Sequence, residues 1–494
     1  MKIGFDNKKY LEMQSAKILE RISMFGNKLY LEFGGKLFDD YHASRVLPGF
    51  QPDSKIKMLS ELKDKAEILI AINANDIEKN KTRSDLGITY DSEVIRLIDV
   101  FRGRGFYVGS VVLTRFAEQP SASAFKKRLE NMGIKVYRHY PIDGYPSDVE
   151  KIVSEDGYGK NEYVVTTRPL VVVTAPGPGS GKMATCLSQL YHENKRGIKA
   201  GYAKYETFPI WNLPLHHPVN IAYEAATADL DDVNMIDPFH LEAYNEMAVN
   251  YNRDVEIFPV LSSMLSRVMG NSPYKSPTDM GVNMAGYCIV DDEVCREASK
   301  QEVIRRYYAA RLDVMKGLIS KDAETKIEIL MQKLHITISD RAVVSAALDK
   351  ERLTQHPAAA IELPDGRIVT GKTGDLLGAS AAAFLNALKV LGDVDDSIPL
   401  ISSAVIAPIQ KLKVEHMGSK NPRLHTDEIL LSLAVSAVTN PVAGHALKQL
   451  TQLKGAQFHS SVILSPADEM TLKKLGINVT CEPRRKTEPQ VLDK

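Results

Sequence analysis

The sequence is poor in cysteine and balanced in charge, and each property excludes a class of protein. Its 494 residues include four cysteines, and no two of them have the C-x-x-C spacing of a zinc site or a redox pair. Neither a disulfide framework nor a structural zinc ion is therefore expected. The 62 basic residues equal the 62 acidic ones, so the composition does not indicate a nucleic-acid-binding protein.

Long hydrophobic runs are also missing. The first five residues, MKIGF, lack the apolar core of a signal peptide, and no run approaches the length that crosses a bilayer. These absences predict a cytoplasmic protein that does not associate with a membrane. A chain of this length is expected to form two to four domains.

Between residues 28 and 205, apolar strand-like runs alternate with amphipathic helices. Repetition of this unit predicts an α/β fold with a mainly parallel, doubly wound sheet. The expected strands are 28–33, 67–72, 107–114, 134–137, 170–174 and 198–205. The connections 34–53, 73–90 and 175–182 would then leave one edge of the sheet, where ligands bind in such folds.

The rest of the chain changes character twice. A helical middle region is expected to contain helices at 291–316 and 321–334, and a hairpin is expected around Pro364-Asp365-Gly366. After this hairpin, further helices and strands, including strands at 460–464 and 477–480 around a helix at 467–475, predict a C-terminal α/β (α+β) domain. The predicted domains are a Rossmann-like and P-loop-like domain over 1–237, a helical domain over 238–350, a C-terminal domain over 351–483 and a flexible tail over 484–494.

The segment 170–182, LVVVTAPGPGSGK, is the most informative part of the chain. A β-branched strand enters a Gly/Pro-rich turn, and a helix is expected over 183–195. At such a turn, free backbone N–H groups and the helix dipole attract an anion, and a lysine adds positive charge. The predicted phosphate-binding residues are Gly177, Gly179, Ser180, Gly181 and Lys182.

This segment departs from the P-loop pattern G-x-x-x-x-G-K-[ST] at two positions. Pro176 stands where the first glycine is expected, and Met183 replaces the hydroxyl residue that binds Mg²⁺. Thr185 could substitute for that hydroxyl only with altered geometry. The segment therefore predicts binding of ATP, another nucleotide or a phosphorylated small molecule, but not standard NTP hydrolysis. An unoccupied strand-to-helix turn is the alternative.

Two other turns combine glycine with lysine. Gly34-Gly35-Lys36 follows a predicted strand and is a candidate anion site in the same crevice, with an ordinary turn as the alternative. The segment 371–375, GKTGD, leads towards a helix, but the exit of a hairpin explains it equally well.

Carboxylates and histidines accumulate between residues 205 and 240. Asp229 and Asp232 are candidate Mg²⁺ ligands, since carboxylates downstream of a phosphate loop can hold this ion directly or through water. Asp231 and His240 are candidate catalytic residues together with Lys182. A helix cap or a bend in a loop would also explain the aspartates.

Peptidase motifs are absent from the sequence. It contains neither H-E-x-x-H nor a G-x-S-x-G nucleophile elbow. Proteolysis is therefore not predicted.

Three long strings resemble one bacterial family. They are YLEFGGKLFDDYHASRVLPGF at 30–50, VVVTAPGPGSGKMATCLSQLYHENKRG at 171–197 and KSPTDMGVNMAGYCIVDDEV at 275–294. The chain is similar over essentially its whole length to the uncharacterised family known as domain of unknown function eighteen-forty-six. This resemblance implies a multidomain α/β cytoplasmic protein whose activity is not established. Some members are labelled ATP-dependent peptidase, a label that the residues above do not support.

Two functions remain as alternatives. One is an enzyme, of transferase or ligase type, acting on a phosphorylated small molecule. The other is a non-catalytic nucleotide-sensing or regulatory protein, with the helical middle region as a moving or oligomerising element. A homo-oligomer is expected in either case. A purely structural assembly protein would bind no phosphate ligand.

Overall fold

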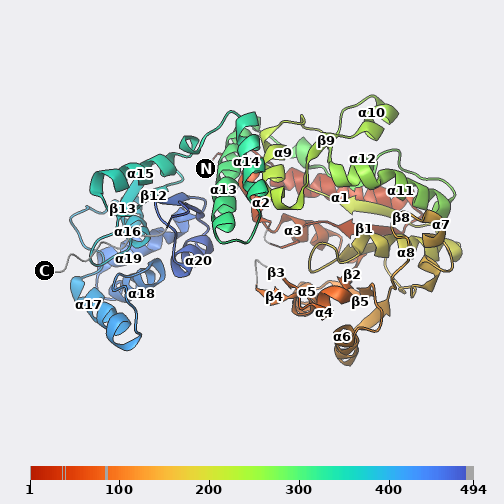
Figure 1. Cartoon of the computed structure of the whole chain (residues 1–494), viewed down its shortest axis with the longest axis horizontal. Helices are drawn as coiled ribbons and strands as arrows, with labels where there is room; N and C mark the ends of the chain where they lie inside the picture. The colour runs from red at the N-terminus through yellow and green to blue at the C-terminus, as the bar shows by residue number, and fades with distance from the viewer. Residues whose placement is uncertain (1, 36, 39, 84–86, 485–494) are drawn as a thin grey trace. The chain divides into compact units, whose positions relative to one another are not determined.

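The computed structural model describes residues 2–35, 37–38, 40–83 and 87–484. These residues form two compact units (Figure 1). The sheet unit comprises 2–224 and 231–298, and the C-terminal unit comprises 225–230 and the described residues from 299 onwards. The predicted boundaries after 237 and 350 fall inside the sheet unit and the C-terminal unit, respectively.

The sheet unit is built on a seven-stranded sheet with the order β11-β8-β1-β7-β2-β5-β6. All neighbouring strands in this sheet are parallel, which confirms the predicted α/β class. The strands are β1 (Leu29–Phe33), β2 (Ala66–Asn73), β5 (Tyr107–Thr114), β6 (Lys135–Arg138), β7 (Leu170–Thr174), β8 (Gly201–Tyr205) and β11 (Gly281–Val282). β1, β2 and β7 are buried along their whole length, as expected for parallel strands covered on both faces.

Side-chain alternation along β1 shows which helices cover each face of the sheet. Tyr30 donates a hydrogen bond to Glu193 of α8 (Lys182–Lys195), so even-numbered positions face α8. Phe33 stacks on Tyr205, whose hydroxyl lies 2.6 Å from that of Tyr10 on α1 (Asn7–Met24). α1 and α8 therefore cover opposite faces. α3 (Ser54–Glu61) packs on α1, and α11 (Asn252–Met269) packs on α8.

The strand order reverses direction at β7. The chain runs from β1 past this position to β2, continues through β5 to β6, and returns to insert β7 between β1 and β2. It then proceeds in the opposite direction through β8 to β11. Because βαβ connections are right-handed, connections that run in opposite directions lie on opposite faces. The carboxyl ends of β1, β7 and β2 therefore border the position where ligands bind in open parallel sheets.

The C-terminal unit contains a separate mixed sheet with the order β13-β12-β14-β15. β12 (Ala358–Glu362) is antiparallel to β13 (Ile368–Lys372) and to β14 (Gln457–Ser460), and β14 is parallel to β15 (Asn478–Cys481). The first pair is the hairpin predicted around residue 365. α15 (Ala342–Thr354) and α16 (Ala379–Leu391) pack on this sheet.

Some predicted elements are shifted or carry a packing role. The helices expected at 291–316 and 321–334 are α13 (Asp292–Met315) and α14 (Lys321–Lys333). The strand expected at 460–464 is wrong in position, because β14 ends at Ser460. Gly371 lies where α16 approaches β13 closely, and a Cβ there would come within 2.1 Å of the Ala383 nitrogen. Close packing therefore accounts for the glycine that begins the 371–375 turn.

Every helix of the described residues is too short or too polar to cross a bilayer.

Candidate functional site

The glycine-rich loop 175–181 joins the central strand β7 to α8. Gly179 and Gly181 have φ values of +76° and +87°, a backbone conformation that favours glycine. Gly181 is the N-cap of α8, and the helical ladder begins with the bond from the Thr185 nitrogen to the Gly181 oxygen (2.9 Å). The N–H groups of residues 182–184 precede this ladder and have no acceptor within the helix. They are placed at the positive end of the helix dipole.

Side chains at the ends of neighbouring strands hold the loop in this conformation. Thr114, the last residue of β5, donates to the Ser180 oxygen at 2.8 Å, and Asn73, the last residue of β2, donates to the Gly179 oxygen at 3.4 Å. The Ser180 hydroxyl donates to the Gly177 oxygen at 2.9 Å. Three loop carbonyls, which would repel an anion, are thus directed at donors of the protein. These hydrogen bonds fix the shape of the loop.

The lysine of the loop faces a buried carboxylate that the sequence analysis did not select. Lys182 Nζ lies 4.0 Å from Oε1 of Glu32 on β1, and their side chains are 17% and 9% exposed. The other oxygen of Glu32, Oε2, accepts a hydrogen bond from the Tyr202 hydroxyl at 2.7 Å. The available signal was a single acidic residue within the apolar run 29–33, because unpaired carboxylates are rarely buried.

The first Gly-Gly-Lys turn follows β1 at the same edge of the sheet. The Gly34 nitrogen donates to the Tyr205 oxygen at 3.3 Å, and Gly35 has a φ of +71°. Lys36 lies outside the described residues. The cation near Gly35 is Lys55, which is buried and forms an ion pair with Asp40 at 2.7 Å. Burial raises the pKa of Asp40, but Lys55 lowers it more, and the net shift is downward. Anion binding at Gly34 and Gly35 stays a prediction.

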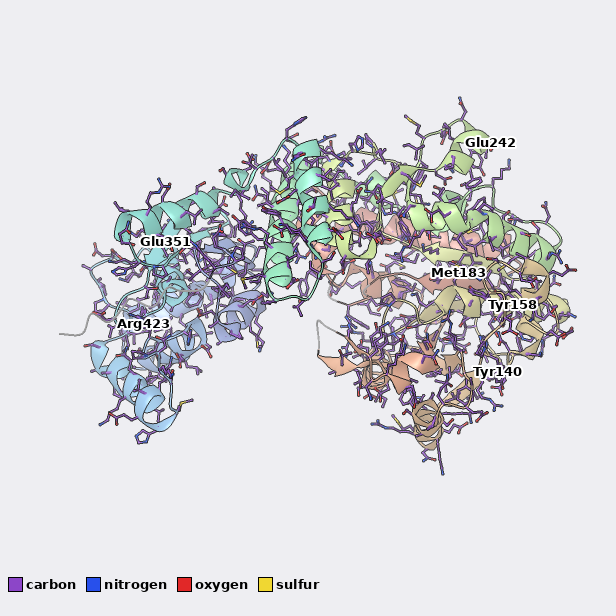
Figure 2. All side chains as sticks on the ribbon, in the orientation of Figure 1. Tyr140, Tyr158, Met183, Glu242, Glu351 and Arg423 are labelled. Carbon is purple, nitrogen blue, oxygen red and sulfur yellow. The ribbon has the colours of Figure 1, made fainter. Side chains whose placement is uncertain are left out.

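Met183 follows the loop lysine, at the position where a P-loop has a metal-binding hydroxyl, and Thr185 is the possible substitute. Neither residue offers an oxygen to a metal ion in this conformation. Thr185 is fully buried, and its hydroxyl donates to the Gly181 oxygen at 2.9 Å. Met183 carries a thioether that packs partly against the core of the sheet unit, where Figure 2 labels it on α8. In this conformation the Thr185 hydroxyl is bonded to the backbone of its own helix.

The residues predicted between 229 and 240 are distributed over the two units. Asp229 lies on the short 3₁₀ helix Ala228–Leu230 of the C-terminal unit, whereas Asp231 and Asp232 belong to the sheet unit. Asp232 forms an ion pair with Arg253 at 2.6 Å. His240 lies on α10 (Pro238–Tyr244), and its Nδ1 is 3.0 Å from the Ser276 hydroxyl. No group of three or more His, Cys, Asp and Glu side chains in the described part of the chain is arranged to hold a metal ion.

A second buried charged cluster lies at the end of β8. Lys204 Nζ is 2.7 Å from Oε1 of Glu206 and also bonds to Asp254 and to the hydroxyl of Tyr251. Burial raises the pKa of Glu206 to about 7, with Asp254 adding to the rise and Lys204 opposing it. Beside this cluster is a small hollow lined by Glu206, Pro209, Trp211, Val249, Asn250, Thr278, Gly281 and Asn283. The density of unusual side chains after residue 205 was the sequence signal for it.

The C-terminal unit contains a serine, a histidine and an aspartate that resemble a hydrolase triad only in composition. His425 Nδ1 is 3.0 Å from Asp468 Oδ2 and 3.2 Å from the Ser465 hydroxyl. A catalytic triad needs the acid on one ring nitrogen and the nucleophile on the other. Here both contact the same nitrogen, and Ser465 also caps α20 (Pro466–Lys474). The geometry is that of helix capping.

The comparisons with known proteins agree with the family resemblance. The family described as "Domain of unknown function DUF1846, N-terminal" matches residues 3–335, and its counterpart "Domain of unknown function DUF1846, C-terminal" matches residues 339–489. This chain belongs to the DUF1846 family. The resemblance noted from the three strings is thereby confirmed, and the family's function is described as unknown.

Two relatives of this DUF1846 chain show how far the similarity extends. The "UPF0371 protein" of Streptococcus pneumoniae (strain JJA) is 59% identical over 482 residues, which cover 98% of each chain. The "UPF0371 protein str1377" of Streptococcus thermophilus (strain CNRZ 1066) has the same identity and coverage. These names state no activity, so neither nucleotide binding nor peptidase activity follows from them.

Proposed function

We propose that the loop 175–181, the amino end of α8 and Lys182 bind the phosphate of a nucleotide or of a phosphorylated small molecule. The observation that carries this proposal is the amino end of the 14-residue helix α8 at the strand reversal, where Gly181 is the N-cap and no side chain of the described residues forms a capping hydrogen bond. Backbone N–H groups, the helix dipole and a lysine converge there, and this combination binds anions in other proteins.

The side-chain contacts of the loop support the same conclusion. The hydrogen bonds from Thr114, Asn73 and Ser180 occupy loop carbonyls. A loop held open by the protein itself pays little ordering entropy when a ligand binds.

The proposal is tested by measuring ligand-induced stabilisation. ATP, ADP, GTP, pyrophosphate and sugar phosphates are added to the wild-type protein and to Lys182→Ala, and the melting temperature is recorded with and without each ligand. A ligand at about one hundred times its Kd should stabilise the wild type by about 2.7 kcal/mol. Loss of the lysine should weaken binding about tenfold or more, since a charge-assisted contact is removed.

The control is Lys199→Ala, which removes an exposed lysine near the end of α8. It should respond to each ligand as the wild type does. Lys182→Ala removes the cation that faces the buried Glu32, which can lower the melting temperature even without a ligand. The ligand-induced shift of the melting temperature is therefore compared, rather than the melting temperature itself. If no phosphate compound stabilises the wild type, or if Lys182→Ala responds equally, phosphate is not bound here.

A further inference from the structure

We propose that the phosphate ligand binds together with a divalent metal ion, and that Glu32 is the protein carboxylate that holds this ion. This inference rests on the function proposed above and specifies the ligand as a metal–phosphate complex. It is carried by the position of Glu32 opposite Lys182.

The first argument is local charge. A terminal phosphate carries nearly two negative charges at neutral pH. Bound to Lys182, it would lie within a few ångströms of Glu32, because Glu32 Oε1 is 4.0 Å from Lys182 Nζ. Both side chains are largely buried, so water screens the carboxylate–phosphate repulsion only weakly. The attraction to the lysine is then opposed by a repulsion of similar size.

A divalent cation removes this conflict. The charges of Lys182 and Glu32 cancel each other. A divalent cation cancels the nearly two negative charges of the phosphate, so the net charge of the site is about zero. Mg²⁺ typically uses one or two protein carboxylates, with phosphate oxygens and water as its remaining ligands. A single carboxylate beside a phosphate site is therefore sufficient, and the site needs no cluster of acidic residues.

The two oxygens of Glu32 have different surroundings, which favours this role. Oε2 accepts the hydrogen bond of the buried Tyr202 hydroxyl at 2.7 Å, which fixes the orientation of the carboxylate. Oε1 faces Lys182 at 4.0 Å, a distance too long for a direct hydrogen bond. The carboxylate is thus nine-tenths buried, oriented by a neighbour, and directed at the phosphate site with one oxygen.

The metal would approach the phosphate from β1. In the P-loop pattern, the hydroxyl that follows the lysine binds Mg²⁺, and here that position is Met183. Glu32 lies on the adjacent strand, with its Cα paired to that of Val173 in β7. An oxygen ligand from β1 therefore replaces the one missing from α8.

The inference is tested by calorimetric titration of ATP and of pyrophosphate, each with Mg²⁺ or with EDTA, into the wild type, Glu32→Gln and Lys182→Ala. The wild type should bind each compound about tenfold more tightly, or better, in the presence of Mg²⁺ than in the presence of EDTA. Glu32→Gln should bind the metal-free ligand more tightly than the wild type does, and should lose most of the enhancement by Mg²⁺. Glutamine still accepts the Tyr202 hydrogen bond, so folding should be preserved.

Glu130→Gln removes an exposed carboxylate on α6 (Pro120–Asn131) and should match the wild type. As a second readout, Mn²⁺ bound with pyrophosphate should give a protein-bound electron paramagnetic resonance signal in the wild type and not in Glu32→Gln. Binding that is equal in Mg²⁺ and EDTA, or Mg²⁺ enhancement retained in Glu32→Gln, would overturn the metal role alone. If neither compound binds but a sugar phosphate still stabilises the wild type, the metal–phosphate inference is overturned and the phosphate site stands; if no phosphate compound binds, both are overturned.

Discussion

At the scale of residues, two buried carboxylates near the adjacent strands β1 and β8 have different charged partners. Glu32 on β1 has one tyrosine donor and faces one lysine. Glu206, directly after β8, shares Lys204 with Asp254, so two carboxylates compete for one cation in a buried setting. The electrostatic cost of two negative charges is avoided when one carboxyl stays protonated. Burial disfavours the charged form of Glu206 and is the main cause of the rise of its pKa to about 7, and the negative charge of Asp254 adds to this rise.

This shift makes the stability of the sheet unit depend on pH. The pKa of Glu206 rises from 4.5 to about 7 on folding, so between these values the folded protein holds a proton that the unfolded chain releases. The stabilisation is complete below the lower value and is lost as pH rises through the upper one. We expect the wild-type melting temperature to fall between about pH 5 and pH 8 by more than that of Glu206→Gln, which stays neutral.

The exposed-site variant Glu130→Gln serves as the control and should keep the wild-type slope. A Glu206→Gln protein with an unchanged pH dependence would show that another group titrates in this range.

At the scale of elements, the glycines in the loop and after the end of α8 are required for different structural reasons. Gly181 has a positive φ, and a Cβ there would come within 2.9 Å of the Thr114 side chain. Gly179 has a positive φ but open space around it, and so does Gly197 after the end of α8. Thr114 also donates to the loop, so the contact that excludes a side chain at Gly181 is part of what shapes the loop.

Alanine substitutions separate the strain of a positive φ from the steric conflict with Thr114. Gly179→Ala and Gly197→Ala should each cost about 1 kcal/mol of unfolding free energy, from backbone strain alone. Gly181→Ala should cost about 2–3 kcal/mol, because steric conflict adds to the strain. Urea unfolding followed by fluorescence measures all three. Equal losses at Gly179 and Gly181 would contradict the close approach of Thr114.

Sequence patterns were sufficient to locate some of the helices and strands but not others. The central strands, the glycine loop and α8 were located because continuous β-branched runs and glycines are local signals. The strand expected at 460–464 was misplaced because β14 has polar side chains whose partners are distant in sequence. His459 bonds to Thr480 of β15 at 3.0 Å, and Gln457 receives a hydrogen bond from the fully buried Arg341 at 2.8 Å. Periodicity of apolar residues cannot reveal such pairs.

At the scale of the whole molecule, the division into two units predicts more than one unfolding transition. Each unit has its own sheet, and chains with several units usually deviate from two-state behaviour. The only tryptophan of the sequence, Trp211, lies in the sheet unit and donates to the Asn283 oxygen at 3.0 Å. Its fluorescence therefore reports on the sheet unit, whereas far-ultraviolet circular dichroism reports on both.

We expect urea unfolding to give a fluorescence transition and a circular dichroism curve that do not coincide. Arg341→Ala should move only the circular dichroism component of the C-terminal unit, because the arginine donates at 2.9 Å to the Asn478 oxygen and its loss leaves buried acceptors unpaired. Gly181→Ala should move the fluorescence transition. Coincident curves that respond equally to both substitutions would show that the chain unfolds as one cooperative unit.

The sequence by itself determined the α/β class, the position of the glycine-rich loop and the family, because these follow from local patterns and from long strings that resemble the family. It also placed the lysine and the glycines of the loop. Only the tertiary structure decided that β7 lies between β1 and β2, and hence that Glu32 faces Lys182. The same holds for the cluster around Lys204. Strand order depends on which distant segments pair, and that choice is made by packing of the whole sheet rather than by any local run of residues.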